Sequence, residues 1–270
     1  MERNRKRIIL VGCGALGTII AEGICNKLSE DYELSAVYDY DRFQASKLAA
    51  EWNIPIVTSL EEIIKEKPDY VVEAASQNAI FSMALPVIEA GIDMVILSVG
   101  ALSDNNLKGK LEYSGRKSGA KLYVASGAIG GFDLMRAVRF GGLQKAKIHT
   151  RKNPHSLNGA PYLNGRTLAD KEEQSVFLGN AGEAIIGFPK NVNVAVAMAL
   201  ATLGIEHTEV EISSCPQAKE NTHCINLDGN FGSVRIEVAV KPSDKNAKSS
   251  TLAAWSVLAL LEKMAQTIVI

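Results

Sequence analysis

A glycine-rich hexapeptide near the start of the chain has the residue types and spacing of a phosphate-binding turn. It follows an apolar run at 8–11, precedes residues with helical spacing, and consists of Gly12, Cys13, Gly14, Ala15, Leu16 and Gly17. The first glycine allows a tight turn, the second lets a pyrophosphate approach the backbone, and the third lets the helix pack on the strand. Free N–H groups at the helix start favour an anion. We therefore expect every member except Cys13 to bind a dinucleotide, and a tight turn without a ligand is the alternative.

An acid follows the second apolar run, at 34–38, and could recognise the ribose of that dinucleotide. Asp39 stands at about the separation from the glycines at which a carboxylate binds the adenine ribose. A carboxylate there repels a 2′-phosphate and so favours NAD. Asp41 and Arg42 follow at once, and an arginine in this place can accept NADP. We predict NAD as the cofactor with NADP use left open, and the alternative for Asp39 is a turn residue at a strand end.

Three more segments of small residues follow predicted strands, which is where ligands bind in a doubly wound sheet. They are Ala74-Ala75-Ser76, Ser98-Val99-Gly100-Ala101 and Ser126-Gly127-Ala128-Ile129-Gly130-Gly131. Small side chains keep the crevice open, so we expect Ala75 and Ser98 to contact the cofactor. The last segment lies at the predicted seam between two domains and could line the nicotinamide end of the cofactor. A flexible linker is the alternative for that segment.

A dehydrogenase also needs a group that moves a proton while hydride is transferred, and histidine is the usual choice near neutral pH. The chain has four, at His149, His155, His207 and His223. Position alone does not select among them. His223 is the candidate that we single out, and a structural histidine is the alternative. Asn193 stands at the start of an apolar helical pattern, where its amide suits a carboxamide or stabilises its own helix.

Alternating strands and helices must position these residues in the first half of the chain. Strands are predicted at 8–11, 34–38, 56–57, 70–73, 94–97 and 122–124, with helices at 18–27, 44–52, 60–65, 80–89 and 108–117. This order indicates a parallel sheet with helices on both faces. We therefore predict an α/β protein whose N-terminal Rossmann domain, a doubly wound parallel sheet, spans residues 1–131.

The pattern changes after about residue 130. We predict strands at 147–152, 209–213, 224–228 and 233–241, a loop at 153–165, and an apolar helix at 192–203. Asp228-Gly229-Asn230 is a hairpin signal. The second α/β domain, at 132–246, is thus expected to have a mixed or antiparallel sheet. A helix at 249–266, within a segment at 247–270, is expected to pack back on the first domain.

Composition and charge exclude several classes of protein. The 270 residues are 47% apolar and carry a net charge of −1, which favours a globular protein without a nucleic-acid partner. The four cysteines form no CxxC pair and no zinc spacing, so we expect no metal site and reduced thiols. No signal peptide or membrane-spanning run is visible, which indicates a cytoplasmic protein. The basic cluster at 3–7 is interpreted as a solvated extension.

Taken together, these motifs resemble those of the L-aspartate dehydrogenase family across nearly the whole chain. The resemblance is carried by residues 12–17 and 126–131, Thr150-Arg151-Lys152, Asn191-Val192-Asn193-Val194-Ala195, Asn221-Thr222-His223 and Leu252-Ala253-Ala254-Trp255-Ser256. The glycine turn is widely shared, whereas the other motifs are more specific in combination. The family pattern after Arg151 usually continues with prolines, but this chain has Asn153-Pro154-His155.

The resemblance implies a reaction and several site residues. The reaction is the reversible oxidative deamination of L-aspartate with NAD(P), giving iminoaspartate, or oxaloacetate and ammonia after hydrolysis, and it can supply pyridine-nucleotide synthesis. Ala128 and Asn193 would contact the dinucleotide, His223 would be catalytic, and the domain at 132–246 would carry substrate binding and the dimerisation of a homodimer. Proton transfer by His223 would require a pKa near the working pH. Arg151, Lys152 and Lys190 are unranked candidates for binding the two substrate carboxylates.

Two other readings remain at this point. An oxidoreductase resembling dihydrodipicolinate reductase or homoserine dehydrogenase would have a similar two-domain plan. A non-catalytic NAD(H)-sensing protein would need a DNA-binding or partner-docking element, and the sequence contains no added helix-turn-helix and no basic recognition face.

Overall fold

The computed structural model describes residues 5–241 and 250–269 and divides into two compact units. The first comprises Met1–Ala125 and Ala253–Ile270, and the second comprises Ser126–Leu252. The small-residue run at 126–131, expected to end the first domain, therefore belongs to the second unit. Residues 1–4, 242–249 and 270, which include parts of the expected N-terminal extension and of the expected segment at 247–270, lie outside the described residues.

The first unit is built on a five-stranded parallel sheet with the order β2-β1-β3-β4-β5. Its strands are β1 (Lys6–Val11), β2 (Tyr32–Tyr38), β3 (Tyr70–Glu73), β4 (Asp93–Ile96) and β5 (Leu122–Val124). Buried apolar runs such as Val71-Val72 are typical of strands covered on both faces. The parallel Rossmann sheet predicted from the alternating pattern is confirmed.

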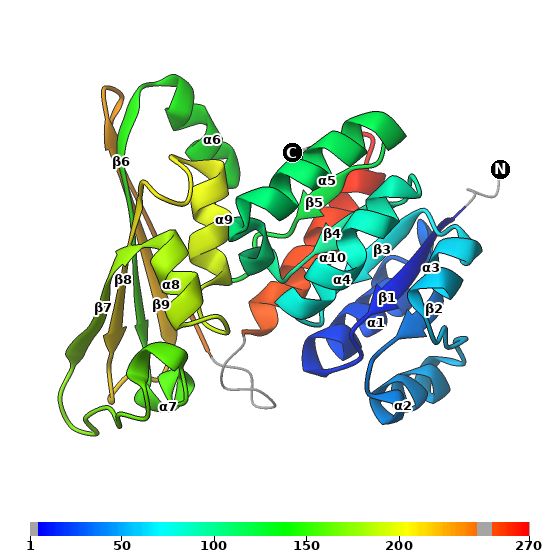
Figure 1. The fold of residues 1–270 in the computed structure, drawn as a ribbon, viewed down its shortest axis with the longest axis horizontal. Helices are drawn as coiled ribbons and strands as arrows, with labels where there is room; N and C mark the ends of the chain where they lie inside the picture. The colour runs from blue at the N-terminus through cyan, green and yellow to red at the C-terminus, as the bar shows by residue number, and fades with distance from the viewer. Residues whose placement is uncertain (1–4, 242–249, 270) are drawn as a thin grey trace. The chain divides into compact units, whose positions relative to one another are not determined.

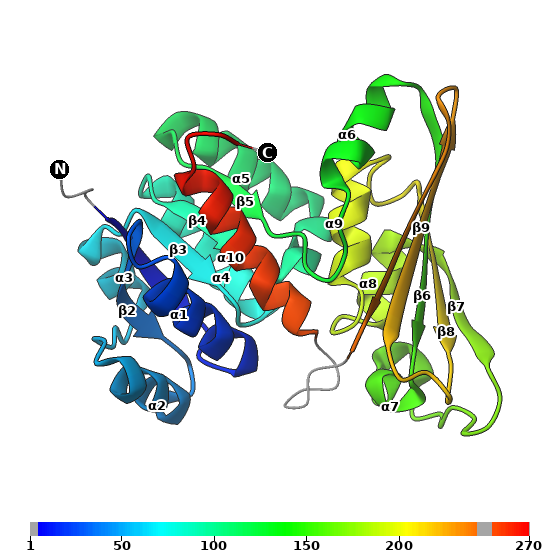
Figure 2. The same cartoon turned by 180° about the vertical axis from the view of Figure 1, so that it is seen from behind.

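Helices cover both faces of this sheet, as Figures 1 and 2 show. They are α1 (Ala15–Lys27), α2 (Arg42–Trp52), α3 (Leu60–Glu66), α4 (Gln77–Glu89), α5 (Asn105–Ser118) and α10 (Thr251–Ala265), with a 3₁₀ turn, η1 (Val99–Ser103). Helices α1 and α10 lie on one face and α4 and α5 on the other. Ala254, Val257 and Leu261 of α10 join the buried core of the sheet, and the hydroxyl of Tyr32 donates a 2.7 Å hydrogen bond to the carbonyl of Leu261.

The second unit contains a five-stranded mixed sheet with the order β10-β9-β6-β8-β7. Its strands are β6 (Leu143–Lys152), β7 (Gln174–Asn180), β8 (Thr208–Ser214), β9 (Asn221–Gly229) and β10 (Gly232–Val240). Only β6 and β8 pair in parallel; the other three pairings are antiparallel. The hairpin predicted at Asp228-Gly229-Asn230 is confirmed by the pairing of β9 with β10. The mixed sheet agrees with the predicted fold class.

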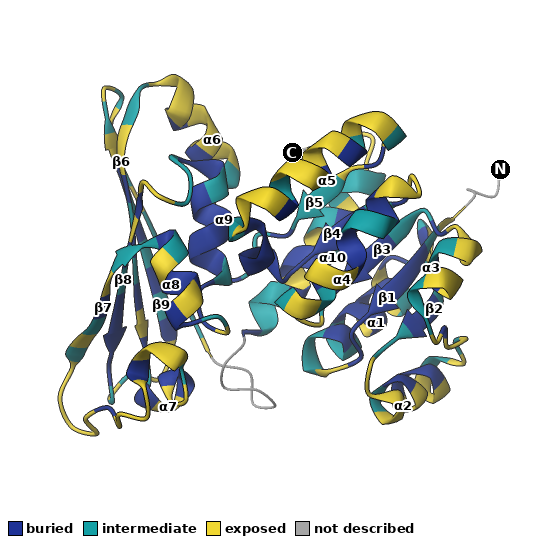
Figure 3. Cartoon of the chain, in the orientation of Figure 1, coloured by how far each residue is buried: buried dark blue, intermediate teal, exposed yellow. Residues whose placement is uncertain are grey.

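Helices of the second unit lie along one face of its sheet (Figures 1 and 2). They are α6 (Phe132–Phe140), α7 (Pro154–Leu157), α8 (Ala181–Gly187) and α9 (Asn193–Ala201), with a 3₁₀ turn, η2 (Pro161–Leu163). Helix α9 is almost entirely buried, as Figure 3 shows, because its residues are apolar on every side. The opposite face of the sheet carries polar and charged side chains.

The structure differs from the sequence-based expectations in three respects. Residues 56–57 form only an isolated bridge, between Ile56 and Val37, and not a strand. The loop expected at 153–165 contains α7 and η2. Helices α6 and α8 and strand β7 were not expected. Helix α8 spans only seven residues and β7 is an edge strand with a bulge, so the sequences of α8 and β7 show no long apolar period. Asn180 and Glu183 form a capping box that fixes the start of α8.

Candidate active site

The glycine turn between β1 and α1 has the geometry that its spacing predicts. Gly12 has φ +100°, and a Cβ there would lie 2.6 Å from the carbonyl oxygen of Ala74. A Cβ on Gly17 would collide with the carbonyl oxygen of Gly12, so helix and turn are packed as closely as glycine permits. By contrast, a Cβ on Gly14 would meet no atom within 4 Å. The turn is therefore tight at its first and third glycines and open at the second.

The N-terminus of α1 offers unsatisfied donors beside that opening. Gly14 is the N-cap, no side chain caps the helix, and its first turn contains no acidic residue. Gly14 is exposed, while Ala15 and Leu16 are half-buried. An uncapped helix start with a partial positive charge and an open glycine fits the pyrophosphate of a dinucleotide.

Asp39 is held against the glycine turn by its carboxylate. The backbone N–H of Cys13 donates to Oδ2 at 2.7 Å, and that of Asp41 donates to Oδ1 at 2.8 Å. Each carboxylate oxygen accepts one further hydrogen bond without difficulty, which suits a ribose diol. Asp41 instead caps α2 by accepting from the N–H of Phe43 at 2.9 Å, and Arg42 is an exposed residue of the first turn of α2.

A buried carboxylate that the sequence analysis missed organises the next two strand ends. Glu73, fully buried at the end of β3, accepts hydrogen bonds from the N–H groups of Ala75, Leu97 and Ser98 and from the hydroxyl of Ser98, at 2.7–3.2 Å. Burial raises the pKa of Glu73, and these four bonds oppose that rise. Ala75 and Ser98 are the two predicted cofactor contacts at these strand ends. The backbone N–H groups of both residues and the hydroxyl of Ser98 thus donate to Glu73. An acid directly after an apolar strand was the available signal.

In the second unit, the structure places His223 beside two other polar side chains in the buried face of the sheet. Its exposure is 2%, and its Nδ1 lies 3.0 Å from the hydroxyl oxygen of Thr150, which is directly opposite on β6. Lys152, two residues further on β6, shares that face because side chains alternate along a strand. Among the described residues, Nε2 of His223 has no hydrogen-bond partner and is available to a substrate.

The environment of His223 keeps its imidazole neutral at neutral pH. Burial lowers the pKa of His223 to about 3, and the positive charge of Lys152 adds to that shift. The expectation of a pKa near the working pH is therefore wrong for this environment, since desolvation disfavours the imidazolium. A neutral imidazole whose Nδ1–H is donated to Thr150 presents a lone pair on Nε2, as a base requires.

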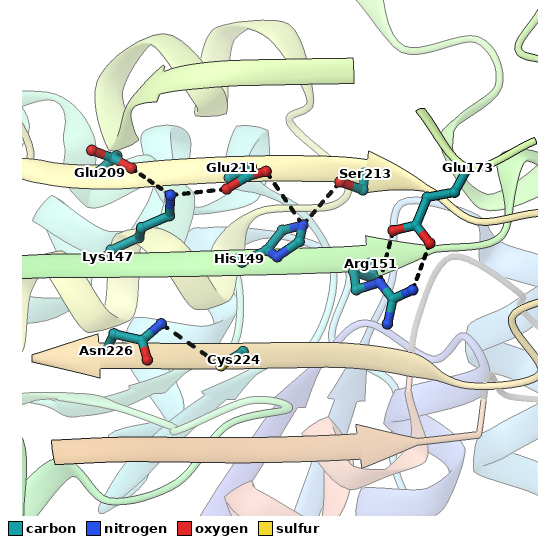
Figure 4. Close-up of polar contacts among 9 residues, drawn as sticks. All are labelled: Lys147, His149, Arg151, Glu173, Glu209, Glu211, Ser213, Cys224 and Asn226. Atoms are coloured by element: carbon teal, nitrogen blue, oxygen red, sulfur yellow. Dashed lines mark hydrogen bonds and ion pairs between the residues drawn. The ribbon is translucent and has the colours of Figure 1, made fainter. Parts of the chain in front are cut away.

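The other sequence candidates lie elsewhere on the second unit. Figure 4 shows Arg151 bound through two hydrogen bonds to Glu173, and His149 near Ser213 and Glu211. Strand alternation places both on the face of the sheet opposite to His223. Lys190, His155 and His207 are exposed. The structure thus ranks Lys152 above Arg151 and Lys190 as a cation near His223.

The two predicted nicotinamide contacts are close to one another within the second unit. Ala128 is 8% exposed and follows Gly127, whose added Cβ would lie 3.6 Å from Cγ1 of Val194 in the first turn of α9. Asn193 is the half-buried first residue of that helix. Tertiary packing therefore brings together two motifs about 65 residues apart in the chain.

Neither a metal centre nor a membrane span is found in the parts of the chain that the structure describes. No group of three or more His, Cys, Asp or Glu side chains within residues 5–241 and 250–269 could hold a metal ion. None of the helices formed by these residues combines the length and apolar character that crossing a bilayer demands.

Comparison with known proteins decides the family. The model for the NAD binding domain of homoserine dehydrogenase matches residues 12–125, and that for the C-terminal domain of aspartate dehydrogenase matches residues 133–264. L-aspartate dehydrogenases of Methanosarcina mazei and Nitrosopumilus maritimus are 38% and 37% identical to the chain, with 96% of each sequence covered. The chain belongs to the aspartate dehydrogenase family. It is accordingly an oxidoreductase with a nicotinamide-dinucleotide-binding first unit, and the resemblance stated from its motifs is confirmed.

Solved structures of the family and of more distant proteins share this fold. Aspartate dehydrogenase from Thermotoga maritima superposes with a TM-score of 0.77 at 26% identity, covering 99% of this chain and 100% of that one. GenD2 from gentamicin A biosynthesis, solved in complex with NAD, reaches a TM-score of 0.62 at 15% identity, covering 100% of this chain and 90% of that one. The second likeness is one of fold alone.

Proposed function

We propose that this protein is an NAD-dependent L-aspartate dehydrogenase in which His223 is the catalytic base. The observation that supports the role of His223 most directly is its buried imidazole, held through Nδ1 by Thr150 and without a described partner at Nε2. The observation that supports the substrate is 38% identity to an L-aspartate dehydrogenase over 263 residues. The proposal includes action in the cytoplasm, as a homodimer, in a reaction that supplies pyridine-nucleotide synthesis.

Each unit has a distinct part in the proposed reaction. In the first, residues 12–17 and Asp39 hold the dinucleotide, which when bound accepts hydride from the Cα of aspartate. In the second, Nε2 of His223 takes a proton from the substrate ammonium, so that the nitrogen lone pair can form the C=N bond as hydride leaves. The resulting imine is iminoaspartate. Once the imidazolium has released its proton to solvent, the same imidazole can take a proton from the water that attacks the imine carbon, and hydrolysis gives oxaloacetate and ammonia.

Turnover in the aminating direction tests the substrate assignment. The purified protein should oxidise NADH, followed at 340 nm, when oxaloacetate and ammonia are both present and not when either is omitted. Aspartate should reduce NAD in the reverse assay, whereas homoserine should not. Activity on homoserine without activity on aspartate would contradict the proposal, and tight NADH binding without turnover of any amino acid would favour the sensing protein.

Asp39 should determine the cofactor preference. We expect a higher kcat/KM with NADH than with NADPH, because the Asp39 carboxylate repels a 2′-phosphate and accepts hydrogen bonds from the ribose. In Asp39→Asn this ratio should fall by about 10-fold or more, which is the loss of a hydrogen bond to a charged group. Measuring both cofactors on the same preparation cancels losses of folded protein. An unchanged ratio would show that Asp39 does not select the cofactor and serves only to hold the backbone N–H groups of Cys13 and Asp41.

A further inference from the structure

Three polar side chains on the face of the sheet that carries His223 have fewer hydrogen-bond partners than buried groups require. Lys152 is 4% exposed, and its only hydrogen bond within the described structure is a long one, 3.5 Å from Nζ to the carbonyl oxygen of Asn191. The hydroxyl of Ser214, 0% exposed, and Nε2 of Gln174 are buried without any partner among the described residues. Buried polar atoms are almost always paired, so three unmet groups in one place need an explanation.

These three side chains form one row across the sheet. Lys152 on β6 pairs with Ser214 on β8, and Ser214 pairs with Gln174 on β7. Paired residues on neighbouring strands are about 4.8 Å apart and point to the same face. This is also the face of His223, because Thr150 lies opposite His223 and Lys152 is two residues beyond Thr150. The row therefore lies on the same face of the sheet as His223, the proposed base.

Every unmet group in the row can donate a hydrogen bond, and the row carries a positive charge. Burial lowers the pKa of Lys152 to about 8, and no acidic side chain of the described chain offsets this effect. The acids on the same strands lie on the other face, where Glu209 and Glu211 pair with Lys147 and Glu173 pairs with Arg151 (Figure 4). A buried cation without a counterion is costly, so the row is suited to an anionic ligand.

We propose that Lys152 and Ser214, with Gln174 beside them, bind a carboxylate of the substrate next to His223. This inference rests on the proposed function in one respect, namely that the substrate is a dicarboxylate. The carboxylate accepts from the ammonium of Lys152 and the hydroxyl of Ser214, and it supplies the missing negative charge. It also offsets the Lys152 charge at His223, so that binding of the correct substrate makes the imidazole a better proton acceptor.

Calorimetric titration with succinate, a dicarboxylate that cannot be turned over, tests the site in the full-length protein with saturating NAD. Lys152→Met should weaken succinate binding about 10- to 100-fold, the loss of a charge-assisted hydrogen bond. Ser214→Ala should weaken it about 3- to 10-fold without lowering Tm, since it removes a hydroxyl that has no partner. Ser213→Ala is the matched control, because its hydroxyl lies on the opposite face beside His149 and succinate binding should stay unchanged.

The same variants assayed with oxaloacetate and with pyruvate show which carboxylate is bound. If KM rises for oxaloacetate alone, Lys152 and Ser214 bind the carboxylate distal to the reacting carbon, which pyruvate lacks. If KM rises for both keto acids, they bind the carboxylate beside the reacting carbon. Either result supports the site. Succinate binding that depends on Lys152 in a protein inactive on aspartate would refute the proposed reaction and keep the site. Wild-type succinate affinity in Ser214→Ala and in a folded Lys152→Met would overturn the inference.

Discussion

Replacing His223 with alanine should lower kcat for oxaloacetate reduction in the presence of ammonia by about 10²- to 10⁴-fold, the usual contribution of a positioned acid–base group. NADH affinity should be unchanged, because the residues expected to bind its pyrophosphate and adenine ribose are the glycine turn and Asp39. Single-turnover kinetics with pre-bound NADH measures the first quantity, and fluorescence titration of NADH measures the second. An equal loss of turnover and NADH binding would assign His223 a structural role.

His149→Ala is the matched control for this variant. His149 lies on β6, one residue before the Thr150 that contacts His223, but on the other face of the sheet, with Ser213 2.9 Å from its Nε2. Its removal should leave kcat unchanged. If both histidine variants lost activity together, damage to the sheet and not loss of a base would explain the effect.

Replacing Glu73 with glutamine should have the second large effect, a loss of about 2–4 kcal/mol in the free energy of unfolding. Each carboxylate oxygen of Glu73 accepts two hydrogen bonds. In glutamine one of these oxygens becomes an NH₂ group, which cannot accept and would face a backbone N–H donor. At least one backbone N–H would lose its acceptor. Urea denaturation followed by circular dichroism measures the change.

The same substitution should weaken NADH binding, because the turn at 74–76 packs against Gly12 and Glu73 holds that turn through the N–H of Ala75. Glu66→Gln provides the control. Glu66 forms an exposed ion pair with Arg7 at 3.0 Å, and such pairs contribute roughly 0–1 kcal/mol. A Glu73→Gln protein as stable as the Glu66→Gln protein would show that Glu73 is protonated and that its hydrogen bonds contribute little.

Local motifs allowed the first unit to be predicted closely. The strand at Tyr70–Glu73 and the strand at Leu122–Val124 were predicted with the bounds that the structure has. The first is buried from Val71 to Glu73, which explains its apolar run, whereas the second is a half-buried edge strand that was visible as a short apolar run between polar segments. The glycine turn was equally visible, since its first and third glycines, Gly12 and Gly17, are required by close backbone atoms of the neighbouring strand end and of the turn itself. Edge strand β7 was missed because a bulge interrupts the alternation of its side chains, and helix α8 was missed because seven residues are too few to show a helical period.

The sequence by itself determined the family, the two α/β units and the phosphate-binding turn, because each is encoded by residues adjacent in the chain. It named Arg151, Lys152 and Lys190 without ranking them, and it gave no sign that Ser214 lies beside Lys152 or that Glu73 accepts hydrogen bonds from the end of the next strand. Only tertiary structure decided these points, because Thr150 and His223 meet across 73 residues and the register of β6 with β8 and β9 sets the face on which each side chain lies. A shift of one residue in that register would turn Lys152 to the opposite face of the sheet and place Arg151 on the face of His223.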